Sequence, residues 1–210
     1  MTVWDKIYKN YQKGGDAWAT LSEEIHPLFK TFLEEEVFDL KSVFDIGCGT
    51  GKYLEFLKEY GFKTDGIDSS ETAVEMTREK LSPDSLVVCT NMFEFAIPQN
   101  KYDLVISIAT IHHGTKKQVQ GLINKVHEAL VEGGKIFITL PDIESTKKWN
   151  TFKDHEEVAP GTFEPLAGPE QGLPHSFYAK EEIEELFSQF ENVQIDLDDR
   201  GRWIVRAKKS

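Results

Sequence analysis

Three glycines at alternate positions give the sequence its clearest chemical signal. They follow a short apolar run that carries an acid, so that residues 43–51 read Val-Phe-Asp-Ile-Gly-Cys-Gly-Thr-Gly. Glycine has no Cβ and tolerates positive φ, so a ligand can approach the backbone of such a turn closely. An amphipathic stretch follows at 53–57, and the free amide groups at the start of a helix offer donors to a ligand. The pattern predicts a strand, a ligand-binding turn and a helix.

The glycine spacing argues against the two common phosphate-binding loops. A dinucleotide-binding loop has the pattern G-x-G-x-x-G, which would need a third glycine where the chain has Lys52. A P-loop needs Ser or Thr after Gly-Lys, and Tyr53 follows Lys52. A plain turn stays open as the alternative, although three alternating glycines exceed what such a turn requires.

The pattern D-x-G-x-G-x-G at residues 45–51 resembles motif I of the class I S-adenosylmethionine-dependent methyltransferases. The resemblance implies that S-adenosylmethionine is the cofactor, that the loop wraps its methionine end, and that the acid lies near its positive charges. It assigns the following residues to cofactor binding: Asp45, Gly47, Cys48, Gly49 and Gly51. Apart from this, Cys48 and Cys89 are interpreted as small buried residues.

Asp68 is the second acid expected at the cofactor. It ends a stretch at 62–67 that is predicted to be the second strand, about 20 residues after the glycines, where a carboxylate can accept both hydroxyls of a nucleoside ribose. The alternative is that Asp68 or Ser69 caps the helix predicted over 71–81. Because Ser69 or Ser70 can fill the cap, we favour Asp68 as the ribose ligand, with Ser69 beside it.

Two later strand ends complete the expected cofactor site. Residues 85–89 are predicted to be the third strand, and Asn91 and Met92 follow it. In the methyltransferase family an Asp often meets the adenine amino group here and the next residue contributes a backbone amide. The Asn91 side-chain carbonyl can accept the same bond. Residues 102–108 form a strongly apolar strand, and Ile108 at its end is assigned to the cofactor site.

His112 and His113 are the candidate catalytic residues. Ligands bind beyond the carboxyl ends of the strands in doubly wound sheets, and this pair follows the strand at 102–108. Imidazole titrates near neutrality, so either residue can act as a general base or position a substrate; capping or bridging a loop is an equally good interpretation. Adjacent side chains project differently, so we expect at most one to point inward. No carboxylate or cysteine completes a recognisable ligand spacing nearby, so no metal is predicted.

Aromatic residues and a third histidine are the candidates for substrate contact. Apolar residues recur at helical spacing over 4–11, and Gly14-Gly15 ends this stretch. A second helix is predicted over 22–38, with Ser22 as its N-cap and Leu28, Phe29, Phe32, Leu33 and Val37 on its apolar face. The two helices either pack on the edge of the sheet or close over the site as a lid. The candidates are Tyr8, Tyr11, Trp18 and His175.

The order of the elements predicts one α/β domain over 1–210. Helices are expected at 116–130, ended by Gly133-Gly134, and at 179–190; strands are expected at 135–140 and, as a hairpin, at 193–197 and 203–207. The resemblance implies a Rossmann-like, doubly wound sheet of seven strands, with strand 7 antiparallel and helices on both faces. The expected parts are a helical lid or edge (1–40), the cofactor-binding core (42–141), a Pro- and aromatic-rich insertion over the active site (142–176), and a closing helix and hairpin (177–210).

Composition is that of an ordinary soluble protein. Apolar residues make up 40% and charged residues 29% of the 210 residues. No apolar run approaches the roughly 20 residues of a membrane helix, the N-terminus has no apolar signal region, and two cysteines do not make a secreted disulfide framework. We therefore expect a cytoplasmic protein without a membrane partner. The net charge of −12 favours a small-molecule partner over nucleic acid, which normally meets a basic face, but leaves nucleic acid open. The oligomeric state is not predicted.

Three functions follow from these observations. The first choice is an S-adenosylmethionine-dependent methyltransferase that acts on an oxygen or nitrogen nucleophile of a small molecule. The stretch Ile-Ser-Ile-Ala-Thr-Ile-His-His at 106–113 also resembles the wobble-uridine tRNA methyltransferases, so a tRNA substrate is the second. A non-catalytic regulatory module that binds the adenosyl cofactor is the third, and the intact motifs around one pocket argue against it.

Overall fold

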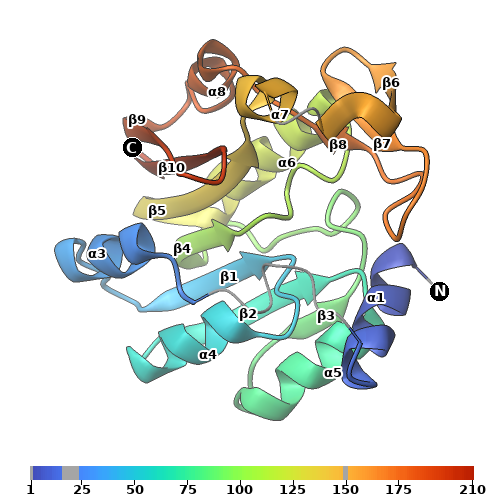
Figure 1. Ribbon diagram of the computed structural model, residues 1–210. Helices are drawn as coiled ribbons and strands as arrows, with labels where there is room; N and C mark the ends of the chain where they lie inside the picture. The colour runs from blue at the N-terminus through green and yellow to red at the C-terminus, as the bar shows by residue number, and fades with distance from the viewer. Residues whose placement is uncertain (1, 16–23, 149–150) are drawn as a thin grey trace.

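A seven-stranded sheet forms the centre of the computed structural model, which describes residues 2–15, 24–148 and 151–210. The strand order is β3-β2-β1-β4-β5-β10-β9 (Figure 1). The strands are β1 (Ser42–Ile46), β2 (Lys63–Asp68), β3 (Val87–Cys89), β4 (Tyr102–Ser107), β5 (Leu130–Pro141), β9 (Glu191–Leu197) and β10 (Arg202–Lys208). Strands β1 to β5 pair in parallel, whereas β10 is antiparallel to both β5 and β9. The predicted α/β class, the seven strands and the antiparallel last strand are confirmed.

Helices cover both faces of this sheet. They are α1 (Val3–Gln12), α3 (Pro27–Glu35), α4 (Lys52–Glu59), α5 (Glu71–Lys80), α6 (Lys116–Ala129), α7 (Ile143–Lys148) and α8 (Lys180–Leu186), with the 3-10 turn η1 (Thr151–Asp154). One hydrophobic core joins the sheet to α6 and α8, and includes Val119 and Ile183. A second core joins it to α3, α4 and α5, and includes Phe29, Leu54 and Val74. The two cores confirm the prediction of helices on both faces.

The central strands explain where a site can form. Every residue of β1 and of β4 is buried, as expected for parallel strands covered on both faces. The carboxyl ends of β1 to β4 lie at one edge of the sheet, so the loops that follow these strands meet there. Helix α1 and a small second sheet lie beyond this edge (Figure 1). The strands of the small sheet are β6 (His155–Ala159), β7 (Thr162–Pro165) and β8 (His175–Ser176).

The second N-terminal helix is shorter than predicted. Helix α3 begins at Pro27, and the Leu28 amide donates to Nδ1 of His26 at 3.2 Å. Proline suits the first turn of a helix, because its missing N–H would be unpaired there in any case. Ser22, the expected cap, lies outside the described residues. The helix ends at Glu35, and Val37 is 77% exposed instead of packing in the core.

The segment at 142–176 has more regular structure than its Pro-rich sequence suggested. It contains α7, η1 and the three strands of the small sheet. Strand β6 reads His-Glu-Glu-Val-Ala and is largely exposed, so it lacks the alternation of apolar and polar residues that identifies a strand. The division of the chain into lid, core, insertion and closing hairpin stays a prediction.

The glycine pair after α6 does not end that helix. Helix α6 ends at Ala129, and β5 begins at the next residue, so Gly133 and Gly134 lie within the strand. Gly133 has a φ of 76°, and the pairing of β4 with β5 shifts register between Tyr102 and Leu104. Glycine here permits an irregular start to a strand. No helix among the described residues is both long enough and apolar enough to cross a membrane.

Candidate active site

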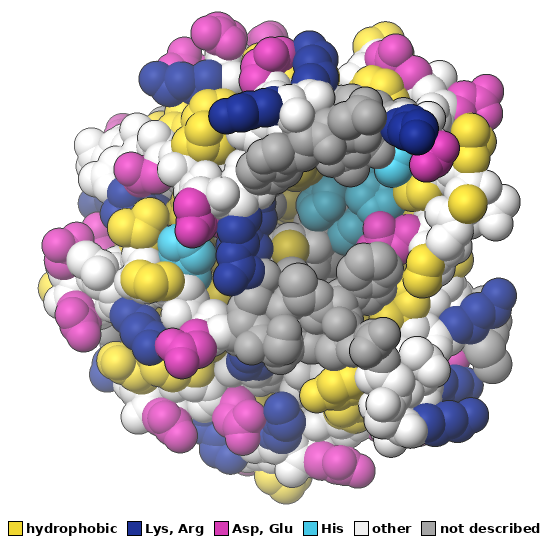
Figure 2. Space-filling model, viewed as in Figure 1, with side chains coloured by type: hydrophobic (Ala, Val, Ile, Leu, Met, Phe, Trp, Pro, Cys, Tyr) yellow, Lys and Arg dark blue, Asp and Glu magenta, His cyan; other side chains and the backbone are white. Residues whose placement is uncertain are grey.

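A cavity of about 880 Å³ lies at the carboxyl edge of the parallel strands, within the size range of small-molecule sites. Its wall combines the glycine loop after β1, the end of β2, the loops after β3 and β4, the start of α1 and the segment that leads into β8. Figure 2 shows a hollow on this face with histidine side chains in its wall. The cavity therefore brings together most of the residues that the sequence nominated.

The glycine loop adopts a conformation that other residues rarely adopt. Gly47, Gly49 and Gly51 have φ values of 80°, 55° and 77°. A Cβ on Gly47 would lie 2.1 Å from the Thr110 side chain, and one on Gly49 would lie 2.6 Å from the Tyr8 hydroxyl. Gly47 and Gly49 line the cavity, whereas Gly51 is the N-cap of α4 and does not. Gly51 thus shapes the turn, and its direct contact with the cofactor stays a prediction.

Two buried carboxylates, Asp45 and Asp68, face the cavity. Asp68 accepts hydrogen bonds from the amides of Gly49 (3.0 Å) and Ser70 (2.9 Å). Burial raises the pKa of Asp68, and burial together with the neighbouring Asp68 raises the pKa of Asp45. A cationic ligand would relieve this repulsion. Burial also raises the pKa of the Cys48 thiol, which agrees with a small buried residue and not a nucleophile.

Ser70, and not Ser69, caps the helix after β2. The Ala73 amide donates to the Ser70 hydroxyl at 3.2 Å. Ser69 lines the cavity, and its carbonyl accepts a hydrogen bond from the Thr2 hydroxyl at 3.1 Å. Ser70 therefore caps the helix, as one of the two serines was expected to do, and Asp68 lines the cavity wall.

Asn91, Met92 and Ile108 also line the cavity. The Asn91 side-chain oxygen accepts a hydrogen bond from the Phe93 amide at 2.9 Å. A carbonyl oxygen has two lone pairs, so a bond from an adenine amino group would share this oxygen with Phe93. The assignment of these three residues to the cofactor stays a prediction.

Helix α1 contributes Tyr8 and Trp4 to the cavity wall, whereas Tyr11 does not line it. Trp18 lies outside the described residues. Burial, followed by the charge of Asp68, raises the pKa of Tyr8. Trp4 was not among the sequence candidates, although it begins the same apolar stripe; its ring lies edge-on to His113, with centroids 4.8 Å apart.

Asp5 holds α1 against the start of α5. One carboxylate oxygen accepts from the Thr72 amide (3.1 Å), the Thr72 hydroxyl (2.8 Å) and the Ser70 hydroxyl (3.1 Å). The other lies 2.9 Å from Nζ of Lys9. These contacts fix the helix that presents Trp4 and Tyr8 to the cavity.

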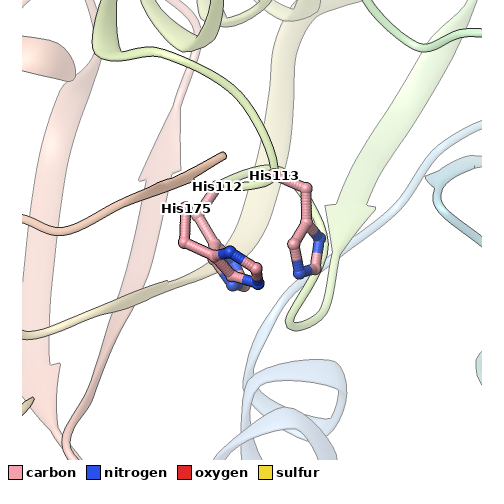
Figure 3. A group of neighbouring side chains, drawn as sticks. All are labelled: His112, His113 and His175. Atoms are coloured by element: carbon pink, nitrogen blue, oxygen red, sulfur yellow. The ribbon is translucent and has the colours of Figure 1, made fainter. Parts of the chain in front are cut away.

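Three histidines converge in the cavity (Figure 3). The ring centroids of His112 and His113 are 4.1 Å apart, those of His113 and His175 are 4.7 Å apart, and those of His112 and His175 are 5.7 Å apart. Both adjacent histidines line the cavity, so the expectation that at most one points inward is wrong. The two residues lie in a turn, and not in a strand, so their side chains do not alternate between opposite faces.

Burial keeps the adjacent histidines uncharged. It lowers the pKa of His112 well below its ordinary value, with further contributions from His113 and His175. Burial, followed by the neighbouring His175, lowers the pKa of His113 to about 3. A neutral imidazole has a free lone pair, but a base of low pKa provides little driving force for proton transfer.

Two charged residues that the sequence did not single out also line the cavity: Glu170 and Arg202. Glu170 Oε2 lies 3.1 Å from Nε2 of His175, and Nε of Arg202 donates to Asp198 at 2.8 Å. Glu170 lies in the segment before β8, and Arg202 begins β10. Neither belongs to a motif, so only the tertiary structure reveals them.

Comparison with known proteins supports the resemblance to methyltransferases. Residues 43–134 match a family described as a methyltransferase domain. The Bos taurus protein named "Probable tRNA methyltransferase 9B" is 27% identical over 184 residues, which cover 80% of this chain and 39% of that protein. The phosphoethanolamine N-methyltransferase of Plasmodium falciparum is 28% identical over 159 residues, which cover 74% of this chain and 56% of that enzyme. The crystal structure of PH0226 from Pyrococcus horikoshii OT3 has the same fold, with a TM-score of 0.74 at 17% identity and 100% of both chains covered. Residues 43–134 therefore form a methyltransferase domain, and the fold is that of the S-adenosylmethionine-dependent methyltransferases.

S-adenosylmethionine is the cofactor of the class I methyltransferases, and the cavity of this chain fits it. The glycine loop leaves space that a Cβ would occupy, and two buried acids with raised pKa values suit a ligand that carries an ammonium and a sulfonium group. The chain spans less than two thirds of the length of both curated relatives.

Proposed function

We propose that this methyltransferase transfers the methyl group of S-adenosylmethionine to an oxygen or nitrogen nucleophile of a small molecule. The observation that carries the proposal is one continuous cavity, which extends from the glycine loop and Asp68 to the three histidines. A methyl acceptor must lie in line with the sulfonium and close to it. The wall that His112, His113, His175 and Trp4 form is therefore the acceptor half of the cavity.

The chemistry needs orientation more than covalent participation. S-adenosylmethionine supplies an electrophilic methyl group whose transfer leaves a neutral thioether. Asp68 would accept the ribose hydroxyls, and Asp45 would face the cofactor's positive charge. A bound acceptor that packs against Trp4 would displace water from the acceptor half, which would strengthen the electrostatic contacts there. His112 or His113, in its neutral form, would accept a hydrogen bond and then the proton from a hydroxyl or ammonium nucleophile.

Charge supports a small substrate. The formal net charge is −12, and an acidic protein repels a polyanion unless it carries a local basic groove. The relative from Plasmodium falciparum is named for a small-molecule substrate.

A tRNA substrate is the second candidate. It is favoured by the bovine relative, which is named a probable tRNA methyltransferase and matches 80% of this chain. The stretch at 106–113, which ends in the two histidines, also resembles the wobble-uridine tRNA methyltransferases and so favours tRNA.

A transfer assay distinguishes these candidates. The protein is incubated with S-adenosylmethionine labelled on the methyl group and with either a fractionated small-molecule extract or total tRNA. We expect label in the small-molecule fractions and none in tRNA. Label in tRNA alone would contradict the proposed substrate class. Tight cofactor binding with no transfer to either pool would favour the non-catalytic module.

A further inference from the structure

The three histidines of the acceptor half come from two segments that are distant in the sequence. His112 and His113 follow β4, and His175 begins β8. One ring nitrogen of each lies within 4.8 Å of one nitrogen of each of the others (Figure 3). Nitrogen ligands that each lie about 2.0–2.1 Å from a tetrahedral ion are roughly 3.3 Å from one another. Small side-chain rotations would therefore let all three histidine nitrogens bind one ion.

Backbone hydrogen bonds hold the two segments together. The His112 carbonyl accepts from the Ser176 amide at 2.9 Å and from the Gly114 amide at 2.8 Å. The Ser176 hydroxyl donates to the same carbonyl at 3.2 Å. The convergence of the imidazoles is therefore built into the chain, as a preorganised ligand set requires.

One ring nitrogen of each histidine in the pair has no hydrogen-bond partner among the described residues. Nδ1 of His112 and Nδ1 of His113 are buried, and neither makes a hydrogen bond within the part of the chain that the structure describes. Buried polar atoms are nearly always paired, so such atoms point to a water molecule or an ion. Here two of them belong to rings in contact with each other.

The surroundings of His175 point to a cation. Its Nδ1 lies 2.8 Å from the Leu173 carbonyl, so Nδ1 carries a proton and donates it. In a neutral ring, Nε2 then presents a lone pair to the Glu170 carboxylate, 3.1 Å away. Two lone pairs at this distance repel each other unless a proton or a metal ion binds there. An imidazole whose other N–H is held by a carbonyl is the usual form of a metal-bound histidine.

From these contacts we propose that His112, His113 and His175 form a site for a divalent transition-metal ion, with Glu170 next to His175 as the fourth ligand. Three imidazoles and one carboxylate suit Zn²⁺ and its neighbours in the first transition row, whereas Mg²⁺ and Ca²⁺ prefer oxygen ligands. The sequence predicted no metal because Glu170 and His175 are far in the chain from the His112-His113 pair, so no ligand spacing was visible.

The role of the ion rests on the proposed function, whereas its binding does not. A metal ion in the acceptor half would lower the pKa of a hydroxyl or amine bound next to it. The substrate's proton would pass to water, and the nucleophile would form a bond to the methyl carbon as the carbon–sulfur bond breaks. The bonding electron pair stays on sulfur. In this role the metal ion, and not His112 or His113, would promote the loss of the proton.

Metal titration of the full chain tests the site. The protein is stripped with a chelator and then titrated with Zn²⁺ by calorimetry and with Co²⁺ by visible absorption. We expect one ion per chain, a Co²⁺ spectrum typical of four- or five-coordinate sites, and no binding of Mg²⁺. His175→Ala should weaken Zn²⁺ binding at least tenfold, and Glu170→Gln should weaken it roughly tenfold. An imidazolium–carboxylate pair without a metal is the competing explanation, and it predicts no stoichiometric Zn²⁺ or Co²⁺ binding.

A matched control separates a specific site from general histidine binding. His127 on α6 also has a buried ring nitrogen without a hydrogen-bond partner among the described residues, but it lies outside the cavity. His127→Ala should leave Zn²⁺ binding unchanged; an equal loss in both histidine variants, or unchanged binding in His175→Ala, would overturn the proposal. If His175→Ala does not fold, the Zn²⁺ affinity of Glu170→Gln and the Co²⁺ spectrum of the unmodified chain test the site instead. Unchanged affinity in Glu170→Gln together with no Co²⁺ spectrum would overturn the proposal. Binding of S-adenosylmethionine without binding of Zn²⁺ would reject the metal site and leave the proposed function intact.

Discussion

Burial shifts the pKa values of four titratable residues in the cavity in the direction that favours their uncharged forms. It raises the pKa of Asp45 and Asp68 and lowers that of His112 and His113. Such shifts concentrate at functional sites, because the groups are held there at a cost that ligand binding can offset. At the level of single residues, we therefore expect the part of the cavity around Asp45 and Asp68 to favour a cationic ligand.

Removing the charge of Asp68 should weaken cofactor binding. Hydrogen bonds to charged groups are worth about 1.5–3 kcal/mol, so we expect Asp68→Asn to lower the affinity for S-adenosylmethionine roughly 10- to 100-fold. The Asn side chain retains an oxygen that can accept from the Gly49 or Ser70 amide. Calorimetry measures the affinity, and Asp84→Asn, an exposed position outside the cavity, is the control. Full affinity in Asp68→Asn would remove Asp68 from the site.

Cofactor binding should release protons, because Asp45 has a raised pKa in the free protein. The cofactor's ammonium and sulfonium charges favour the ionised carboxylate, so binding lowers this pKa again. In the pH range between the bound and the free pKa, the group is protonated before binding and ionised after it. Calorimetry in two buffers of different ionisation enthalpy measures the release. Proton uptake in that range would contradict this account of Asp45, and Asp45→Asn should abolish the release.

At the level of elements, the site depends on how α1 and the glycine loop are held. Helix α1 supplies Trp4 and Tyr8, and the Asp5 carboxylate ties it to α5. The glycine loop approaches the Tyr8 hydroxyl so closely that a Cβ on Gly49 would collide with it. A change in either element should therefore reach the cavity.

Asp5→Ala should destabilise the protein. It leaves the Thr72 amide and two buried hydroxyls without their acceptor, at a cost of about 1–3 kcal/mol. Lys9, with Thr72 and Ser70, holds the pKa of Asp5 well below its usual range. A depressed pKa in the folded state stabilises the fold above the unfolded pKa and loses this effect as the pH falls. Denaturant unfolding of Asp5→Ala and wild type should therefore differ most at neutral pH and less below about pH 4.

The control for this prediction lies on the same helix. Lys6 is exposed on α1, so Lys6→Ala should change the free energy of unfolding little. A loss in Lys6→Ala as large as in Asp5→Ala, or a difference between Asp5→Ala and wild type that grows toward low pH, would contradict the anchoring role of Asp5.

Two glycine substitutions should have opposite effects. Gly49→Ala places a Cβ at positive φ and 2.6 Å from the Tyr8 hydroxyl, so we expect a loss of about 1–3 kcal/mol in stability and weaker cofactor binding. Gly121 is exposed on α6, and a Cβ added there would meet no atom within 4 Å. Gly121→Ala should stabilise the protein by about 0.5–1 kcal/mol and leave cofactor affinity unchanged. Thermal unfolding and calorimetry measure both; unchanged affinity in Gly49→Ala would show that the loop does not approach the cofactor.

At the level of the whole molecule, local patterns predicted the sheet and most of the residues that line the cavity around the glycine loop. The alternating glycines at 47, 49 and 51 identified the turn after β1. The apolar runs of β1 and β4 identified the central strands of the sheet. These signals are local, because apolar runs and glycine spacing are patterns among neighbouring residues of the sequence.

The acceptor half could not be predicted in the same way. His175 meets His112 and His113 only because β8 is hydrogen-bonded to the loop after β4. Glu170 and Arg202 reach the cavity from segments without motifs. Strand β6 is exposed and polar, and α3 begins at Pro27 because of a cap that the helical pattern alone did not show. Tertiary contacts decide each of these features.

Calorimetric titration with S-adenosylmethionine, S-adenosylhomocysteine and NAD tests the central claim most directly. The claim is that the cavity between the glycine loop, Asp68 and the histidines is an adenosyl-cofactor site of the methyltransferase type. We predict micromolar binding of the first two ligands and none of NAD, since the loop lacks the glycine spacing of a dinucleotide site. Absence of binding by both adenosyl ligands would contradict the account, and the glycine loop would then be only a turn or a site for another ligand.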